Sequence, residues 1–172
     1  MQTSVTSSEQ IQVHRFSLPV TIGVPLAAIL VQVHLPIYLH FFSIFDLPLL
    51  VTIFFAVARR APVSGLITGG VIGLVQDSLT HQPIGVFGIA KTVVGYVASS
   101  IGVRLDVENP GSRFLMTVIF YVVHEGLFQL IARGLAAEVL QVRWGHLLIA
   151  ALVNGVIAVP LFAVLDKTKQ RT

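Results

Sequence analysis

The sequence contains no cysteine, and charged residues make up only 11% of its 172 positions. The first absence excludes disulfide bonds and thiolate metal sites. The second lies far below the charged fraction of about 25% that soluble domains carry, while hydrophobic residues reach 55%. Ten-residue segments that alternate apolar with polar side chains, as a transmembrane barrel requires, are also missing. The composition therefore predicts an all-α integral membrane protein.

The apolar residues fall in six long blocks, each of 18 to 22 residues. About 20 helical residues cross the hydrocarbon core of a bilayer, so each block is long enough to span it. The blocks cover residues 18–38, 41–58, 62–79, 84–103, 114–135 and 147–165. The sequence thus predicts a bundle of six transmembrane helices joined by short loops.

Lysine and arginine are distributed unequally between the two sets of loops. If the N-terminus is cytoplasmic, eight of these residues lie on the cytoplasmic side: Arg15, Arg59, Arg60, Arg104, Arg113, Lys167, Lys169 and Arg171. The opposite side has only Arg133 and Arg143, and Lys91 lies inside a helix. Because cytoplasmic loops carry the excess of basic residues, this asymmetry predicts that both termini are cytoplasmic.

The first residues are polar and contain Glu9, so they do not resemble a signal peptide. We expect a flexible cytoplasmic tail at 1–14, a membrane domain at 15–166 and a basic cytoplasmic tail at 167–172. The predicted loops are too short to hold a soluble domain.

Small and polar residues line one face of the third block. Gly65, Gly69, Gly73 and Asp77 follow one another at intervals of four, which places them on one stripe of a helix. Such glycines let a second backbone approach closely. Gly95 and Lys91 lie on one face of the next block, and Lys91 is expected at the depth of Asp77. We therefore predict an Asp77–Lys91 pair, which either clamps the hairpin or contacts a partner.

The fifth block carries a polar stripe formed by Tyr121, Glu125 and Gln129. His124 points about 100° away from this stripe. In the sixth block, Asn154 and Gly155 precede Pro160, and Asn154 is expected to meet Glu125 at a similar depth. Two alternatives stay open: hydrogen bonding between the helices, or a polar cavity that accepts a ligand or protons.

No reactive constellation is complete. His124–Glu125 begins the H-E-x-x-H zinc motif, but Phe128 stands where the second histidine must be. Asp46 and Asp77, both near the outer surface, could form an aspartyl dyad, but a cap-like structural role for Asp46 before Pro48 is favoured. We expect no catalytic residue, metal site or cofactor, and no nucleic-acid partner.

Several short motifs occur in a recognisable order. An acidic residue opens an apolar helix at Phe45-Asp46-Leu47-Pro48, and Ala58-Arg59-Arg60 closes it. A glycine-rich helix then runs from Gly65 to Gln76-Asp77-Ser78, followed by Pro83-Ile84-Gly85 and Gly95-Tyr96. Near the end come Val153-Asn154-Gly155, Pro160 and the basic residues of 167–171. Over 44–103 and 150–171 the chain resembles the MreD family of bacterial rod shape-determining proteins, although Phe45 stands where a proline is common.

This resemblance implies a non-enzymatic scaffold of the cell-elongation machinery in the bacterial inner membrane, which helps to organise lateral peptidoglycan synthesis. The direct partner would be the bitopic protein MreC. The actin-like MreB, the glycosyltransferase RodA and a penicillin-binding transpeptidase would belong to the same complex, and membrane lipid would surround it.

The resemblance also implies a fold similar to the substrate-binding subunits of energy-coupling-factor transporters. This similarity provides the alternative function, a substrate-binding membrane subunit of a vitamin transporter. Such a protein needs an outward-facing pocket with converging aromatic and polar groups. The predicted outer loops are short and contain few such groups; Trp144 is the one tryptophan of the chain.

Overall fold

The computed structural model of the chain describes residues 16–80, 82–102, 109–136 and 144–170. These residues form six α-helices and one short 3₁₀ helix, with no β-strand among them. The elements are α1 (Leu18–Tyr38), η1 (His40–Ile44), α2 (Leu47–Arg59), α3 (Pro62–Thr80), α4 (Val86–Gly102), α5 (Pro110–Ala136) and α6 (Trp144–Asp166). The predicted tail at 1–14 and the basic residues Arg15, Arg104, Arg143 and Arg171 lie outside the described residues.

Five of the six predicted blocks correspond to single helices, and the block at 41–58 does not. Its first part forms η1, the chain is extended at Phe45, and α2 begins only at Leu47. Asp46 caps the new helix by accepting a hydrogen bond from the backbone N–H of Leu49 at 2.9 Å. Pro48 follows in the first turn, where its missing N–H costs nothing. The apolar run therefore hid a helix start.

Helix α2 forms the centre of the molecule. It contacts α1, α3, α4, α5 and α6, and every residue from Pro48 to Ala58 is buried. Its 13 residues extend about 20 Å, well short of the hydrocarbon thickness of about 30 Å. A helix that is apolar on all sides and short is thus enclosed by the five longer helices.

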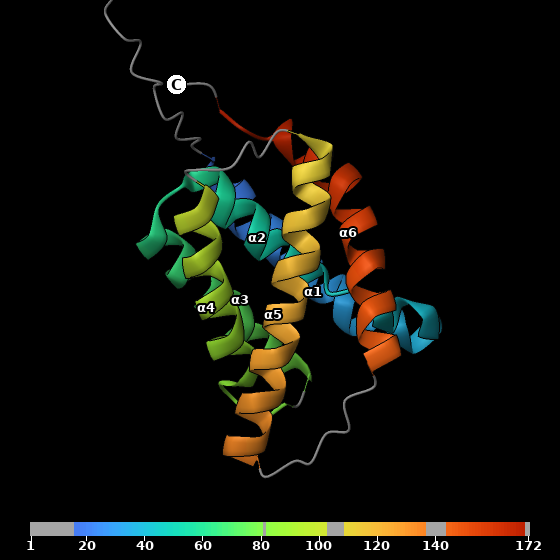
Figure 1. Ribbon diagram of the computed structural model, residues 1–172. Helices are drawn as coiled ribbons and strands as arrows, with labels where there is room; N and C mark the ends of the chain where they lie inside the picture. The colour runs from blue at the N-terminus through green and yellow to red at the C-terminus, as the bar shows by residue number, and fades with distance from the viewer. Residues whose placement is uncertain (1–15, 81, 103–108, 137–143, 171–172) are drawn as a thin grey trace, which may run out of the picture.

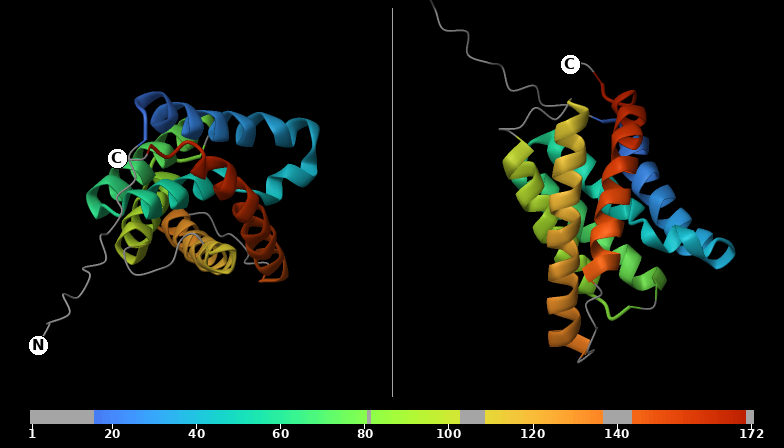
Figure 2. Two further views of the ribbon diagram at one scale, coloured as in Figure 1. Left: turned by 90° about the horizontal axis from the view of Figure 1, so that it is seen from above. Right: turned by 45° about the vertical axis from the view of Figure 1, so that its right-hand side comes forward.

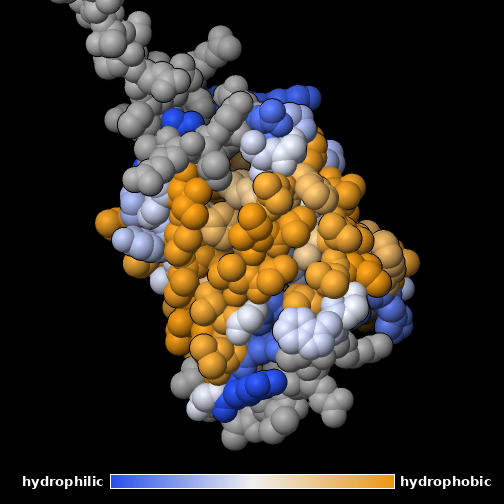
Figure 3. Space-filling model, viewed as in Figure 1, coloured by the Kyte–Doolittle hydropathy of each residue, from blue (hydrophilic) through white to orange (hydrophobic). Residues whose placement is uncertain are grey.

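Among the residues that the structure describes, three helices are long and apolar enough to cross a membrane: α1, α5 over Pro110–Gly134, and α6. α2 and α4 are shorter apolar helices. Hydrophobic side chains cover most of the middle of the face in Figure 3, and hydrophilic ones gather toward its two ends. Large apolar side chains of α5 and α6 are more than half exposed, among them Leu115, Ile119, Leu152 and Val156. Such a surface is that of a protein solvated by lipid.

The first residues of α1 and the last residues of α6 lie at the same end of the bundle (Figures 1 and 2). Side-chain contacts tie the other helix ends there: Arg59 at the end of α2 bonds to Thr21 of α1, and Arg113 of α5 pairs with Asp166 of α6. Basic residues that are distant in sequence therefore meet at one end. Which side of the membrane this end faces stays a prediction.

Candidate functional site

Helices α3 and α4 lie side by side as a tightly packed hairpin (Figure 1). A β-carbon on Gly65, Gly69 or Gly73 would collide with a backbone carbonyl oxygen of α4, that of Gly95, Lys91 or Phe87 respectively. Gly95 meets the carbonyl oxygen of Gly65 in the same way. The predicted close approach along this glycine stripe is therefore confirmed.

Asp77 closes the hairpin at the start of α4, and its expected pairing with Lys91 is wrong. Its carboxylate accepts hydrogen bonds from the backbone N–H groups of Gly85, Phe87 and Gly88, at 2.9, 2.9 and 3.0 Å. These amides lie at the N-terminus of α4, where backbone N–H groups have no partner within the helix and the helix dipole favours a negative charge. Gly85 also has a φ of +107°, which suits glycine. Three backbone donors thus occupy the carboxylate that spacing had assigned to Lys91.

Lys91 pairs instead with Asp46. Its Nζ atom lies 2.8 Å from Oδ2 of Asp46 and 3.2 Å from Nε2 of His124. The ammonium also lies 5.0 Å from the ring centroid of Phe87, within the range of a cation–π interaction. Lys91 is completely buried and His124 nearly so. The N-cap of α2, the second turn of α4 and the middle of α5 are therefore joined at one buried polar centre, formed by Asp46, Lys91 and His124.

The hydrogen bond with Lys91 determines which ring nitrogen of His124 carries the proton. An ammonium group has only donors, so Nε2 of His124 accepts the hydrogen bond from Lys91 and Nδ1 carries the proton. Nδ1 lies 3.8 Å from Oδ2 of Asp46. The imidazole ring stacks on the ring of Phe87 with an interplanar angle of 3°. The sequence pattern assigns His124 no partner, because the predicted contacts follow the neighbouring polar stripe on α5. A lysine predicted inside a helix bundle needs several hydrogen-bond acceptors, and this need could have indicated His124.

Asn154 of α6 forms hydrogen bonds with the backbone just before α2, and not with Glu125. Its Oδ1 accepts from the N–H of Asp46 at 2.9 Å, and its Nδ2 donates to the carbonyl oxygens of Ile44 and Ala150. Both of its N–H donors are occupied, so the expected pairing with Glu125 is wrong. Glu125 accepts a hydrogen bond from Gln129 one turn along α5, at 3.1 Å.

Gln32 of α1 makes a matching pair of bonds from the other side. Its Nε2 donates to the carbonyl oxygen of Phe45, and its Oε1 accepts from the N–H of Leu47. Gln32 and Asn154 therefore satisfy backbone groups at the break between η1 and α2, where lipid would leave them unpaired. Of the remaining candidates, Gly155 packs against the ring of Phe114, while Pro160 lies on an exposed face of α6.

This arrangement suits mechanical rather than chemical work. The Asp46 carboxylate is neutralised by Lys91 and also caps a helix, so it is not available as a base. Within the part of the chain that the structure describes, no three His, Cys, Asp or Glu side chains gather closely enough to hold a metal ion. What the polar centre does is hold three helices in one register.

An apolar helical bundle whose interior carboxylates are satisfied by a lysine or by backbone amides defines an integral membrane protein. The family model described as rod shape-determining protein MreD matches residues 13–168. The chain therefore belongs to the MreD family, as its motifs had predicted. Neither the comparison with curated proteins nor that with solved structures gives a match, and the expected likeness to energy-coupling-factor subunits stays a prediction.

Proposed function

We propose that this protein is a multi-pass scaffold of the bacterial inner membrane. Its six helices cross or enter the bilayer with both termini in the cytoplasm, and it binds the bitopic protein MreC. Through MreC it keeps MreB, RodA and a penicillin-binding transpeptidase in one complex for lateral peptidoglycan synthesis. Membership of a rod shape-determining family over residues 13–168 is the observation that carries this proposal.

The geometry supports a scaffold in two further ways. The interior polar groups bond to one another and to helix ends, which makes the bundle rigid. The outer surface offers apolar helix faces, on which a single-pass helix can pack by van der Waals contact. Catalysis is not part of the proposal, since the site that would perform it is engaged in structural bonds.

Topology is tested by reporter fusions. A reporter placed after Arg171 should give a cytoplasmic signal, and one inserted near Gln82 should give a periplasmic signal. The physical reason is the excess of lysine and arginine in the loops and tails on the side where the two chain termini are predicted to lie. A periplasmic signal from the C-terminal fusion would contradict the six-helix arrangement.

The partner is tested by depletion and co-purification. Depleting the protein should make rod-shaped cells round, and MreC should co-purify with the full-length chain from native membranes. One exposed position on each of four helices is then changed to tryptophan: Ile22 on α1, Ile67 on α3, Ile119 on α5 and Val156 on α6. All four are about half exposed, so the variants should fold, and the one that loses MreC marks the binding face.

The vitamin-transport alternative predicts different results. A small molecule would remain bound through purification, an ATPase module would bind the cytoplasmic end, and cell shape would persist on depletion. Those results together would overturn the scaffold proposal.

A further inference from the structure

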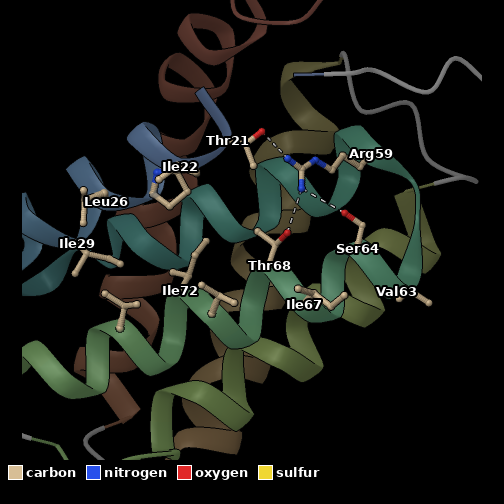
Figure 4. Close-up of a pocket in the computed structure, with 13 residues that line it drawn as sticks. Thr21, Ile22, Leu26, Ile29, Arg59, Val63, Ser64, Ile67, Thr68 and Ile72 are labelled. Carbon is tan, nitrogen blue, oxygen red and sulfur yellow. Dashed lines mark hydrogen bonds between the residues drawn. The ribbon is translucent and has the colours of Figure 1, made fainter. Parts of the chain in front are cut away.

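An open groove with a volume of about 540 Å³ lies between α1 and α3. Figure 4 shows Ile22, Leu26 and Ile29 of α1 facing Ile67 and Ile72 of α3 across it. Several of these aliphatic side chains are about half exposed, as expected for a wall in contact with lipid chains. The groove is separate from the buried polar centre, because none of the three residues of that centre lines it.

One end of the groove is closed by a single arginine. Arg59 donates from Nη1 to the hydroxyl oxygens of Ser64 and Thr68, and from Nη2 to that of Thr21 at 2.8 Å (Figure 4). Its guanidinium also lies 5.2 Å from the ring centroid of Phe55. The guanidinium is thus held in place at the head of an aliphatic groove.

The charge of Arg59 is not neutralised by the described part of the chain. The ion pairs there involve Lys91, Arg113, His124 and Lys169, but not Arg59, and no acidic residue lines the groove. A guanidinium has five N–H donors, and the three hydroxyl bonds use three of them. The Nε donor, one Nη2 donor and the positive charge therefore remain for a further acceptor, and charge complementarity favours an anion.

The length of the groove matches one leaflet. Along α3 it extends from Val63 to Val75, which is about 18 Å at 1.5 Å per residue. Half of the hydrocarbon core measures about 15 Å. An acyl chain that begins at the headgroup level needs this depth, whereas a partner helix that spans the bilayer is about 30 Å long and would be covered by the groove only in part.

From these observations we propose that the groove between α1 and α3 binds an anionic phospholipid. The phosphate group accepts hydrogen bonds from Arg59, and one acyl chain lies along the aliphatic side chains of α1 and α3. Arginine suits this role because its planar fork matches the oxygens of a phosphate. The lipid would occupy the leaflet at the end of the bundle where the basic residues gather, the leaflet in which anionic headgroups attract them.

The test uses the full-length protein in bilayers of equal parts phosphatidylglycerol and phosphatidylcholine with the same acyl chains. Native mass spectrometry then counts the lipids retained by the released protein. The wild type should retain phosphatidylglycerol in about tenfold excess, because the choline cation of phosphatidylcholine cancels the phosphate charge that the unneutralised guanidinium of Arg59 attracts. Arg59→Gln should reduce this ratio to about one, and Arg59→Lys, which keeps the charge, should preserve most of it.

Two matched controls separate lipid binding from folding. Arg60→Asn removes the same charge one residue away, at a φ of 51° that asparagine tolerates, and should keep the wild-type ratio. Ile67→Trp should fill the groove and lower the retention of both lipids, whereas Val156→Trp, equally exposed on α6, should not. If Arg59→Gln does not fold, the two tryptophan variants decide the question.

Any one of four results would overturn the proposal. The first is equal retention of both lipids by the wild type. The second is an unchanged ratio in Arg59→Gln, and the third is equal lipid retention by Ile67→Trp and Val156→Trp. The fourth is a polypeptide that occupies the groove in place of lipid and is released by Ile67→Trp.

Discussion

Two aspartates inside the bundle, Asp77 and the partly exposed Asp46, are stabilised as carboxylates in different ways. Asp77 accepts hydrogen bonds from three backbone amides at the start of the very next helix, 8 to 11 residues along the chain. Asp46 is neutralised by Lys91, 45 residues away on α4. The first carboxylate closes a local hairpin, and the second joins helices that meet only in the assembled bundle. The comparison shows that a carboxylate inside a membrane protein can be stabilised by backbone N–H groups at a helix N-terminus as well as by a lysine.

The largest loss of stability is expected when the backbone contact between α3 and α4, the two helices that Asp77 joins, is broken. Gly69→Leu places a side chain against the carbonyl of Lys91 and forces α3 away from α4, which should cost more than about 4 kcal/mol of stability. Thermal unfolding in detergent measures this loss. Gly126→Leu is the control, since nothing lies within 4 Å of its β-carbon position. Equal melting temperatures for the two variants would contradict the packing described above.

The next largest effect concerns the long-range pair. Lys91→Met leaves the Asp46 carboxylate without its cation, which should cost about 3 to 5 kcal/mol. Adding Asp46→Asn should recover part of this loss, because asparagine keeps an acceptor for the N–H of Leu49. Asp77→Asn combined with Lys91→Met should instead give additive losses. If the coupling free energy between residues 77 and 91 were as large as that between 46 and 91, Lys91 would not be the specific partner of Asp46.

A smaller and more local effect is expected for Asp77→Asn alone. The amide group of asparagine turns a donor toward at least one of the three backbone N–H groups, with a cost of about 1 to 3 kcal/mol. Hydrogen exchange should rise at Gly85, Phe87 and Gly88, the amides that lose an acceptor. Exchange that rises equally throughout α2 would show that the hairpin is not a separate unit.

The smallest effect belongs to His124. His124→Gln keeps an acceptor for the ammonium of Lys91 and should be nearly neutral, whereas His124→Leu should cost about 1 kcal/mol. Thermal unfolding of the two variants measures the difference. A loss for His124→Gln as large as that for Lys91→Met would mean that the imidazole, not Asp46, is the main partner of the lysine.

Local rules predicted most of the helices. The apolar block at 18–38 has the bounds of α1, and α3 extends only one residue beyond its block. The break before α2 was hidden because Phe41, Phe42, Ile44 and Phe45 continue the apolar run up to Asp46. The glycine stripe on α3 was also readable, since its spacing of four depends on the helix period alone.

The partners of the polar residues could not be predicted in this way. Asn154 bonds to residues 108 and 110 positions earlier in the chain, a relation that depends on how α6 packs across the bundle. Counting residues from the turn between α3 and α4 placed Asp77 and Lys91 at the same depth in the membrane. Equal depth does not determine in which direction around the helix axis a side chain points. Orientation around the helix axis, set by tertiary packing, decided between Asp77 and Asp46.

The 45 residues between Asp46 and Lys91 set an order for biogenesis. At a synthesis rate of about 5 to 20 residues per second, the carboxylate emerges from the ribosome about 2 to 9 seconds before its cation. During this interval α2 is too short to span the bilayer and carries an unneutralised charge at its start. The bonds that join the start of α2 to α4 and α6 therefore form late, because each needs a helix that is made after α2.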